Sequence, residues 1–144
     1  MKRMGVIGAG AMGSGIAQVA AMHGAEVLLY DSYPASIVKA RDGILASLNK
    51  LVEKNKITDS EAKASFGRIF FIETLESVSE CEWIIEAVVE EETVKRELFK
   101  HLCAIISPNC ILASNTSSFS ITRLAKDVLY PERCIGIHFF NPPI

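Results

Sequence analysis

The chain has 144 residues, of which 49% are hydrophobic and 22% are charged, and its formal net charge is −2 at pH 7. This length and composition are typical of one soluble α/β domain that buries a substantial core. The charged residues form no basic cluster, so we expect no binding to nucleic acid or to a membrane surface.

The N-terminal part of the sequence predicts a strand, a glycine-rich turn and a helix. An apolar strand over residues 4–8 runs into a turn with glycine at its first, third and sixth positions, and a helix follows over residues 12–23. Gly8 permits the tight turn, Gly10 lets a pyrophosphate approach the backbone, and Gly13 lets the helix pack on the strand. A turn that holds no ligand is the alternative. The residues predicted to bind a dinucleotide here are Gly8, Ala9, Gly10, Ala11, Met12 and Gly13.

An acidic residue after the second predicted strand indicates which dinucleotide binds. Strand 26–30 leads to Asp31, at the position where a carboxylate accepts hydrogen bonds from the adenosine ribose. Ser32 and Tyr33 follow it, and no arginine stands there to accommodate a 2′-phosphate, which favours NAD over NADP. A turn or capping role for Asp31 ahead of Pro34 is compatible with this function. An S-adenosylmethionine methyltransferase shares the glycine loop and the strand-end acid, and is an alternative.

Two helices are predicted between the second and third strands. A long helix runs from Pro34 to about residue 54, and the capping box at residues 58–61 begins a second helix that Gly67 ends after Phe66. These helices form a hairpin-like insertion. The face of the first helix that is predicted to join the core carries Ile37, Ile44, Leu45, Leu48, Leu51 and Val52.

The rest of the chain continues the alternation of strands and helices. The elements predicted there are strand 69–72, a helical segment near 74–79, strand 82–87, helix 91–106, strand 110–113, a helical turn near 120–126 and strand 134–138. The core stripe predicted for the helix over 91–106 consists of Val94, Leu98, Leu102, Ile105 and Ile106. Six alternating strands imply a Rossmann-type α/β fold, with a doubly wound, mostly parallel sheet in the order 3-2-1-4-5-6.

The cysteine spacing and the N-terminal pattern favour a cytoplasmic protein. None of the four cysteines forms a CxxC pair, so we expect neither a disulfide framework nor a metal site. All four are predicted to be buried small apolar residues: Cys81, Cys103, Cys110 and Cys134. The uncharged stretch over residues 4–22 contains five glycines, which makes it a poor candidate for a signal peptide or a membrane span.

Ligands of a doubly wound sheet bind beyond the carboxyl ends of its strands, so the residues that follow each strand are candidates for the site. Glu90 follows the fourth strand, where it either faces the cofactor ribose or places negative charge near a helix N-terminus. Lys95 could reach the same place, but its spacing from Glu91 favours an ordinary ion pair on a solvated helix face.

Small polar residues and a histidine follow the last two strands. Residues 114–118, Ser-Asn-Thr-Ser-Ser, suit hydrogen bonding to a polar ligand, with an ST turn and helix cap as the alternative. His138 follows the last strand, where a neutral imidazole can accept the proton of a hydroxyl group while a nicotinamide takes the hydride. A structural histidine is the alternative. The catalytic role is favoured because His138 is predicted to lie at the same sheet edge as the dinucleotide motif and the polar segment 114–118. His23 and His101 lie in predicted helices and are expected to be structural.

Several segments along the chain resemble those of one family. They are residues 6–20 with the glycine turn, 86–90, 94–99, 111–118, and 131–133 leading to 138–142. Together they resemble the NAD-dependent L-3-hydroxyacyl-CoA dehydrogenases, which include bacterial 3-hydroxybutyryl-CoA dehydrogenases. The resemblance implies reversible oxidation of (S)-3-hydroxyacyl-CoA to 3-oxoacyl-CoA with NAD. A noncatalytic dinucleotide-binding protein of the same fold is the alternative.

The resemblance also implies roles for individual residues. His138 is implied as the catalytic base and Ser117 as a hydrogen-bond donor to the reacting oxygen of the substrate. Ser47 and Lys54 fall where the family contacts coenzyme A, with exposed helix surface as the alternative. The implied cofactor contacts are Asp31, Glu90, Lys95, Asn115 and, to the nicotinamide or the substrate, Asn141.

The chain departs from the family pattern toward its C-terminus. The family has a glutamate beyond the histidine that orients it, followed by a helical domain that makes dimer contacts and closes over the substrate. Residues 1–144 therefore resemble the NAD-binding domain of a longer protein. We expect this domain to bind NAD but to turn over acyl-CoA poorly or not at all, and the parent protein to be a homodimer.

Overall fold

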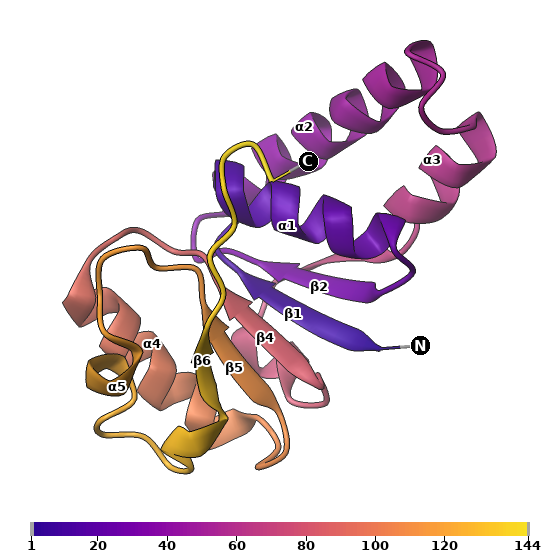
Figure 1. Ribbon diagram of the computed structural model, residues 1–144. Coiled ribbons are helices and arrows are strands. Elements are labelled where there is room, and N and C mark those ends of the chain that lie inside the picture. The colour runs from indigo at the N-terminus through magenta and orange to yellow at the C-terminus, as the bar shows by residue number, and fades with distance from the viewer. Residues whose placement is uncertain (1, 144) are drawn as a thin grey trace.

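A six-stranded sheet organises residues 2–143, which the computed structural model describes (Figure 1). Its strands are β1 (Arg3–Ile7), β2 (Glu26–Tyr30), β3 (Ile69–Ile72), β4 (Trp83–Glu86), β5 (Ile111–Ser114) and β6 (Cys134–Gly136). Every neighbouring pair is parallel, and the order is β3-β2-β1-β4-β5-β6. The doubly wound topology predicted from the sequence is therefore confirmed. The crossovers place the carboxyl ends of all six strands at one edge of the sheet.

Helices cover both faces of the sheet. They are α1 (Ala11–Met22), α2 (Pro34–Glu53), α3 (Asp59–Phe66), α4 (Glu92–Ile105) and α5 (Ile121–Leu124), with short 3₁₀ helices at Leu75–Val78 and Pro131–Arg133. In Figure 1, α1, α2 and α3 lie on one side of the sheet, and α4 and α5 lie on the other. The helices α2 and α3 form the predicted hairpin-like insertion between β2 and β3.

Two separate cores result from the alternation of side chains along each strand, because successive residues face opposite sides of a sheet. The strand residues that pack under α1, α2 and α3 include Val6, Leu29, Ile85 and Ala113. Those that pack under α4 and α5 are Ile7, Leu28, Ile84 and Leu112. Each of these eight side chains is at most 8% exposed.

The start of α3 is fixed by local chemistry. The Thr58 hydroxyl accepts a hydrogen bond from the Glu61 backbone N–H at 3.2 Å, and the Glu61 carboxylate accepts one from the Thr58 N–H at 2.7 Å. This is the capping box that the sequence predicts, and it satisfies backbone donors that a helix start otherwise leaves unpaired.

Three details of the packing differ from the sequence-based expectations. On α4, Val94 is 40% exposed, and the buried positions are Lys95, Phe99, Leu102 and Cys103. The buried face of α4 therefore differs from the predicted one, because it includes Lys95, which a search for apolar residues at helical spacing cannot identify. On α2, Leu45 is 45% exposed, whereas Ile44 and Leu48, four residues apart on one face of the helix, are buried. Cys134 is half-buried, whereas the other three cysteines are buried.

The segment after β6 crosses the carboxyl edge of the sheet. Strand β6 ends at Gly136, two residues before the predicted end, although the Ile137 N–H still donates to the Ser114 carbonyl oxygen at 2.9 Å. The chain then runs toward α1 (Figure 1), where Pro143 packs so tightly on Gly15 that a Cβ there would lie 2.1 Å from its ring. Within residues 2–143, no helix has both the length and the apolar character needed to cross a membrane.

Candidate functional site

The glycine-rich turn between β1 and α1 is tightly packed against neighbouring backbone at two of its three glycines. Gly8 has a φ of 105°, and a Cβ there would lie 2.5 Å from the Ala87 carbonyl oxygen. A Cβ on Gly13 would lie 1.7 Å from the Gly8 carbonyl oxygen. A Cβ on Gly10 would meet no protein atom within 4 Å. Two of the glycines are thus required by packing, and the third leaves open space beside the backbone.

The first turn of α1 faces this open space without a side-chain cap. Gly10 is the N-cap residue, and no side chain caps this helix start. The Ala9 N–H is already used, because it donates to Asp31 Oδ2 at 2.7 Å. Uncapped N–H groups and the positive end of the helix dipole make such a helix start a binding site for phosphate.

Asp31 borders the larger of two cavities at the carboxyl edge, which we call the Asp31 cavity. Its volume is about 850 Å³, and its lining includes Gly8, Gly10, Tyr33 and Val94. The second Asp31 oxygen, Oδ1, accepts from the Tyr33 N–H at 2.9 Å. A carboxylate oxygen can accept two hydrogen bonds, so Asp31 keeps acceptor capacity for a ligand hydroxyl.

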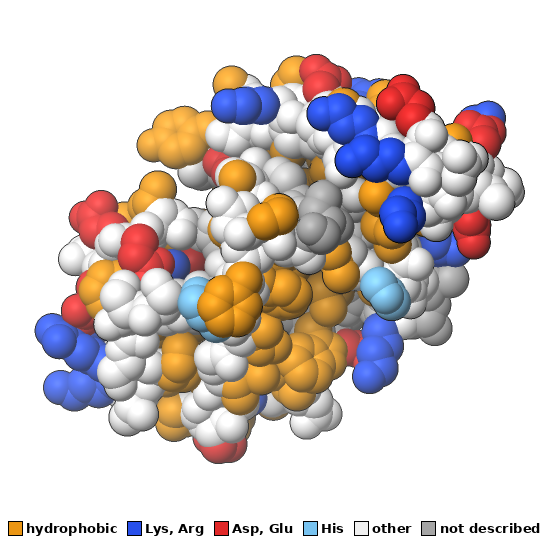
Figure 2. Space-filling view, turned by 45° about the horizontal axis from the view of Figure 1, so that its top comes forward, with side chains coloured by type: hydrophobic (Ala, Val, Ile, Leu, Met, Phe, Trp, Pro, Cys, Tyr) orange, Lys and Arg blue, Asp and Glu red, His pale blue; other side chains and the backbone are white. Residues whose placement is uncertain are grey.

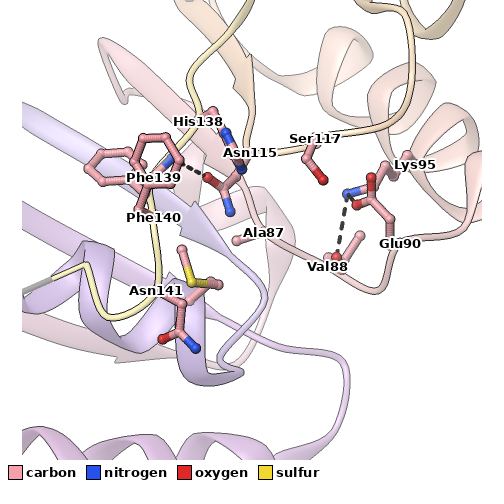
Figure 3. Close-up of a pocket in the computed structure, with 11 residues that line it drawn as sticks. Ala87, Val88, Glu90, Lys95, Asn115, Ser117, His138, Phe139, Phe140 and Asn141 are labelled. Carbon is pink, nitrogen blue, oxygen red and sulfur yellow. Dashed lines mark hydrogen bonds and ion pairs between the residues drawn. The ribbon is translucent and has the colours of Figure 1, made fainter.

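The second cavity, the His138 cavity, gathers most of the predicted site residues (Figure 3). It has a volume of about 370 Å³ and adjoins the Asp31 cavity, since Ala87 and Val88 line both. Its other lining residues are Met12, Glu90, Lys95, Asn115, Ser117, His138, Phe139, Phe140 and Asn141. Residues from α1, from the loops after β4 and β5, from the segment after β6 and from α4 therefore meet in one place.

Lys95 is buried, so the expectation of a solvated ion pair with Glu91 is wrong. Its side chain is 1% exposed, and Nζ lies 2.6 Å from Glu86 Oε1 and 3.2 Å from Glu90 Oε2. It also donates to the Val88 carbonyl oxygen at 3.4 Å. The reason is Glu86 itself, since a buried carboxylate is stable only with a nearby cation and hydrogen-bond donors.

Glu90 is ionised at neutral pH. Partial burial raises its pKa, but hydrogen bonds from Ser118, Thr116 and Lys95 outweigh that effect and hold the pKa of Glu90 at about 2. The Ser118 hydroxyl donates to Glu90 Oε1 at 2.6 Å, and the Thr116 hydroxyl donates to the same atom. These bonds tie the loop after β4 to the loop after β5.

Asn115 joins the β5 loop to the segment after β6. Its Oδ1 accepts a hydrogen bond from the Phe139 N–H at 2.8 Å (Figure 3), which leaves its amide NH₂ group as a donor. Ser117 and His138 lie on either side of this link, and both are exposed. The His138 ring lies 5.0 Å from that of Phe140, centroid to centroid.

Some of the predicted site residues line neither described cavity. Ala9, Ala11 and Gly13 shape the turn, whereas Ser47 is half-buried on α2 and Lys54 is exposed just after it. Thr116 and Ser118 belong to the predicted polar segment 114–118, and in the structure their hydroxyls bind Glu90. Glu86 was not predicted from the sequence as a site residue. For Glu86 a signal was present, since it is a single charge at the end of the apolar strand Trp83–Glu86.

Comparisons with known proteins agree with this arrangement. The sequence profile of the family described as 3-hydroxyacyl-CoA dehydrogenase, NAD binding domain, matches residues 3–144. The chain belongs to this family. The assignment confirms NAD as the cofactor, in agreement with the fingerprint around Asp31.

Relatives match the chain along nearly all of its length. The 3-hydroxybutyryl-CoA dehydrogenase of Bradyrhizobium diazoefficiens is 45% identical over 142 residues, which are 99% of this chain and 48% of the relative. The crystal structure of 3-hydroxybutyryl-CoA dehydrogenase from Escherichia coli has a TM-score of 0.96 at 41% identity, covering 99% of this chain and 30% of that one. For (S)-3-hydroxybutyryl-CoA dehydrogenase from Ralstonia eutropha the TM-score is 0.95 at 37% identity, with 99% and 50% covered. The chain thus spans half or less of these relatives.

Proposed function

We propose that this chain is the cofactor-binding part of an enzyme that reversibly oxidises (S)-3-hydroxyacyl-CoA to 3-oxoacyl-CoA. The observation that carries the proposal is the His138 cavity, where an exposed imidazole and the Ser117 hydroxyl adjoin the residues around Lys95. A protein that only binds a dinucleotide does not need these two groups together. Relatives named 3-hydroxybutyryl-CoA dehydrogenase support the substrate class.

The two cavities fit the two halves of NAD. The adenosine half belongs in the Asp31 cavity, with its ribose on the Asp31 carboxylate, and the pyrophosphate belongs at the open face of Gly10. The nicotinamide half belongs in the His138 cavity, within reach of Glu90 and Asn115. Volumes of about 850 and 370 Å³ lie in the range of small-molecule sites.

The chemistry divides between proton and hydride. Bound NAD supplies the hydride acceptor. An imidazole nitrogen of His138 takes the proton of the substrate 3-hydroxyl group as the C3–H bond breaks, and returns it to the oxygen in the reverse reaction. The Ser117 hydroxyl donates a hydrogen bond to the same substrate oxygen, and the Asn115 and Asn141 side chains orient the groups that react.

Coenzyme A is proposed to lie along α2. Lys and Arg side chains are seen on the part of the surface formed by the helical insertion (Figure 2). Lys50 on α2, and Lys54 and Lys56 just after it, are exposed. Cationic side chains suit the phosphates of coenzyme A. Ser47 and Lys54 are the proposed contacts. The dimer of the longer parent protein stays a prediction.

The test is single-turnover oxidation of bound NADH by excess acetoacetyl-CoA, followed by loss of NADH fluorescence. We expect the wild-type chain to carry out this single step slowly but measurably, even though its steady-state turnover is poor. We expect His138→Gln to slow the step by about 100-fold or more while the Kd for NADH stays within twofold of the wild-type value. A wild-type chain that binds NADH but oxidises it no faster than His138→Gln contradicts the proposal and favours the noncatalytic alternative.

A further inference from the structure

A buried carboxylate that has no role in the proposed chemistry lies under the His138 cavity. Glu86, the last residue of β4, is 0% exposed. Its Oε1 accepts from Lys95 Nζ at 2.6 Å and from the Val88 N–H at 2.8 Å, and its Oε2 accepts from the Ser114 hydroxyl at 2.5 Å. Burial of an ionised carboxylate is unfavourable unless donors compensate for the lost water, and here three donors do so. The three hydrogen bonds therefore hold the Glu86 carboxylate in one fixed position.

Glu86 is the fixed partner among the three acceptors around the Lys95 ammonium. The Glu86 contact is the shortest and is fully buried, whereas the Glu90 contact is 3.2 Å long and Glu90 is 42% exposed. The Val88 carbonyl contact, at 3.4 Å, is the weakest of the three. A ligand in the cavity can therefore replace either of the longer contacts while Glu86 keeps Lys95 in place.

The same carboxylate also fixes the start of both loops that form the cavity. Its bond to the Val88 N–H holds the loop that carries Glu90. Its bond to Ser114 orients a hydroxyl that in turn accepts from the Thr116 N–H at 3.2 Å, at the start of the loop that carries Ser117. In Figure 3, Lys95 and Glu90 lie on one side of the cavity and Asn115 on the other.

We propose that Glu86 is a positioning residue for the nicotinamide half of NAD, acting through Lys95 and through the loops after β4 and β5. This inference rests on the proposed placement of the nicotinamide half in the His138 cavity. The Asp31 cavity, proposed for the adenosine half, contains neither Glu86 nor Lys95 in its lining. Ala87 and Val88 line both cavities, but Lys95 and the loop after β5 line only the His138 cavity. Loss of the Glu86 charge therefore acts mainly on the nicotinamide half, and we expect it to lower the affinity for NADH and to leave that for ADP within twofold.

The experiment compares NADH and ADP binding to the 144-residue chain and to Glu86→Gln. Glutamine keeps the side-chain shape but loses the charge that holds Lys95 and one of the acceptor atoms. We expect the Kd for NADH to rise about tenfold or more, which is the change in affinity that the loss of one hydrogen bond to a charged group produces. The Kd for ADP should stay within twofold of the wild-type value. A purely structural role would weaken both ligands alike, and that result overturns the proposal, as does an unchanged Kd for NADH.

Two further variants complete the test. Ser114→Ala removes one hydrogen bond to Glu86 with a small change of volume, so it tests the proposal even where Glu86→Gln does not fold. We expect a smaller rise in the Kd for NADH and no change in the Kd for ADP.

Glu92→Gln is the matched control, because Glu92 pairs with Arg123 at 2.7 Å and lines neither described cavity. We expect it to bind both ligands as the wild type does. A wild-type chain that binds neither NADH nor ADP would contradict the proposed function itself, and wild-type binding of ADP without NADH would contradict the placement of the nicotinamide half.

Discussion

Gly13 and Gly10 lie three residues apart in one turn, yet a methyl group has opposite consequences at the two positions. At Gly13 it would overlap the Gly8 carbonyl oxygen, a backbone atom that cannot move independently of the turn. We expect Gly13→Ala to lower the free energy of unfolding by about 3 kcal/mol or more. Urea unfolding followed by circular dichroism measures this. A loss below about 1 kcal/mol would show that the turn adapts.

Gly10→Ala is the complementary variant, because its methyl group meets no protein atom. We expect it to fold with a loss of at most about 1 kcal/mol, the scale of a change at an N-cap. The Kd for NADH should rise about tenfold, since the methyl group would lie where the pyrophosphate approaches the backbone. An unchanged NADH affinity in Gly10→Ala would place the phosphates elsewhere.

Glu90 provides a titration that reports on the link between the loops after β4 and β5. Its pKa in the folded chain, about 2, lies below the ordinary value of 4.5. The ionised carboxylate therefore stabilises the fold fully above pH 4.5, and this contribution is lost as the pH falls toward 2. We expect Ser118→Ala to raise the pKa of Glu90 toward 4.5, because it removes the donor at 2.6 Å.

Carboxyl-carbon NMR of Glu90 as a function of pH measures this shift. Thr122→Ala is the control, since Thr122 is exposed and donates no hydrogen bond to Glu90 in the described structure. A Glu90 that titrates at its ordinary value in the wild-type chain would mean that the two loops are not joined in solution.

At the scale of single elements, the capping box of α3 can be separated from the cofactor site. Thr58→Ala removes the side-chain acceptor of the Glu61 N–H, and we expect a loss of about 1 kcal/mol in the free energy of unfolding. NADH binding should not change, since α3 lines neither described cavity. Ser60→Ala, at an exposed position in the same turn, should leave both quantities unaltered. An NADH Kd that rises in Thr58→Ala would show that the insertion supports the site.

Local patterns predicted most elements because their signals are local. Strands β2 and β3 match their predicted bounds, and the cap of α3 follows from four consecutive residues. The inward face of α4 could not be predicted in the same way. Apolar periodicity selects Val94 and Leu98, but the burial of Lys95 depends on Glu86, which lies nine residues earlier on β4. A pairing across two elements leaves no trace in the periodicity of either one.

The gathering of site residues follows from the topology of the whole molecule. Parallel strands bring the residues after β4, β5 and β6 to one edge, so His138, Ser117 and Glu90 could be predicted to lie together from strand order alone. Strand order says nothing about an insertion that extends away from that edge. The proposed coenzyme A contacts of Ser47 and Lys54 are therefore supported by the family resemblance alone, and neither residue lines a described cavity.

The open surface around His138 leads to the last prediction, on steady-state turnover. His138 and Ser117 are exposed, Phe140 is 78% exposed, and hydrophobic side chains gather around the segment after β6 on the face in Figure 2. A site that admits water weakens the hydrogen bonds and charges on which hydride and proton transfer depend. We therefore expect the 144-residue chain to bind NADH yet to produce little or no NADH from NAD and 3-hydroxybutyryl-CoA at steady state.

Absorbance assays at saturating NAD measure this rate, with NADH titration on the same sample to show that the site is intact. The His138→Gln chain provides the background rate. Turnover within the ordinary range of enzymes, about 1 s⁻¹ or more, would contradict the prediction. It would mean that residues 2–143 already exclude water from the site well enough for catalysis.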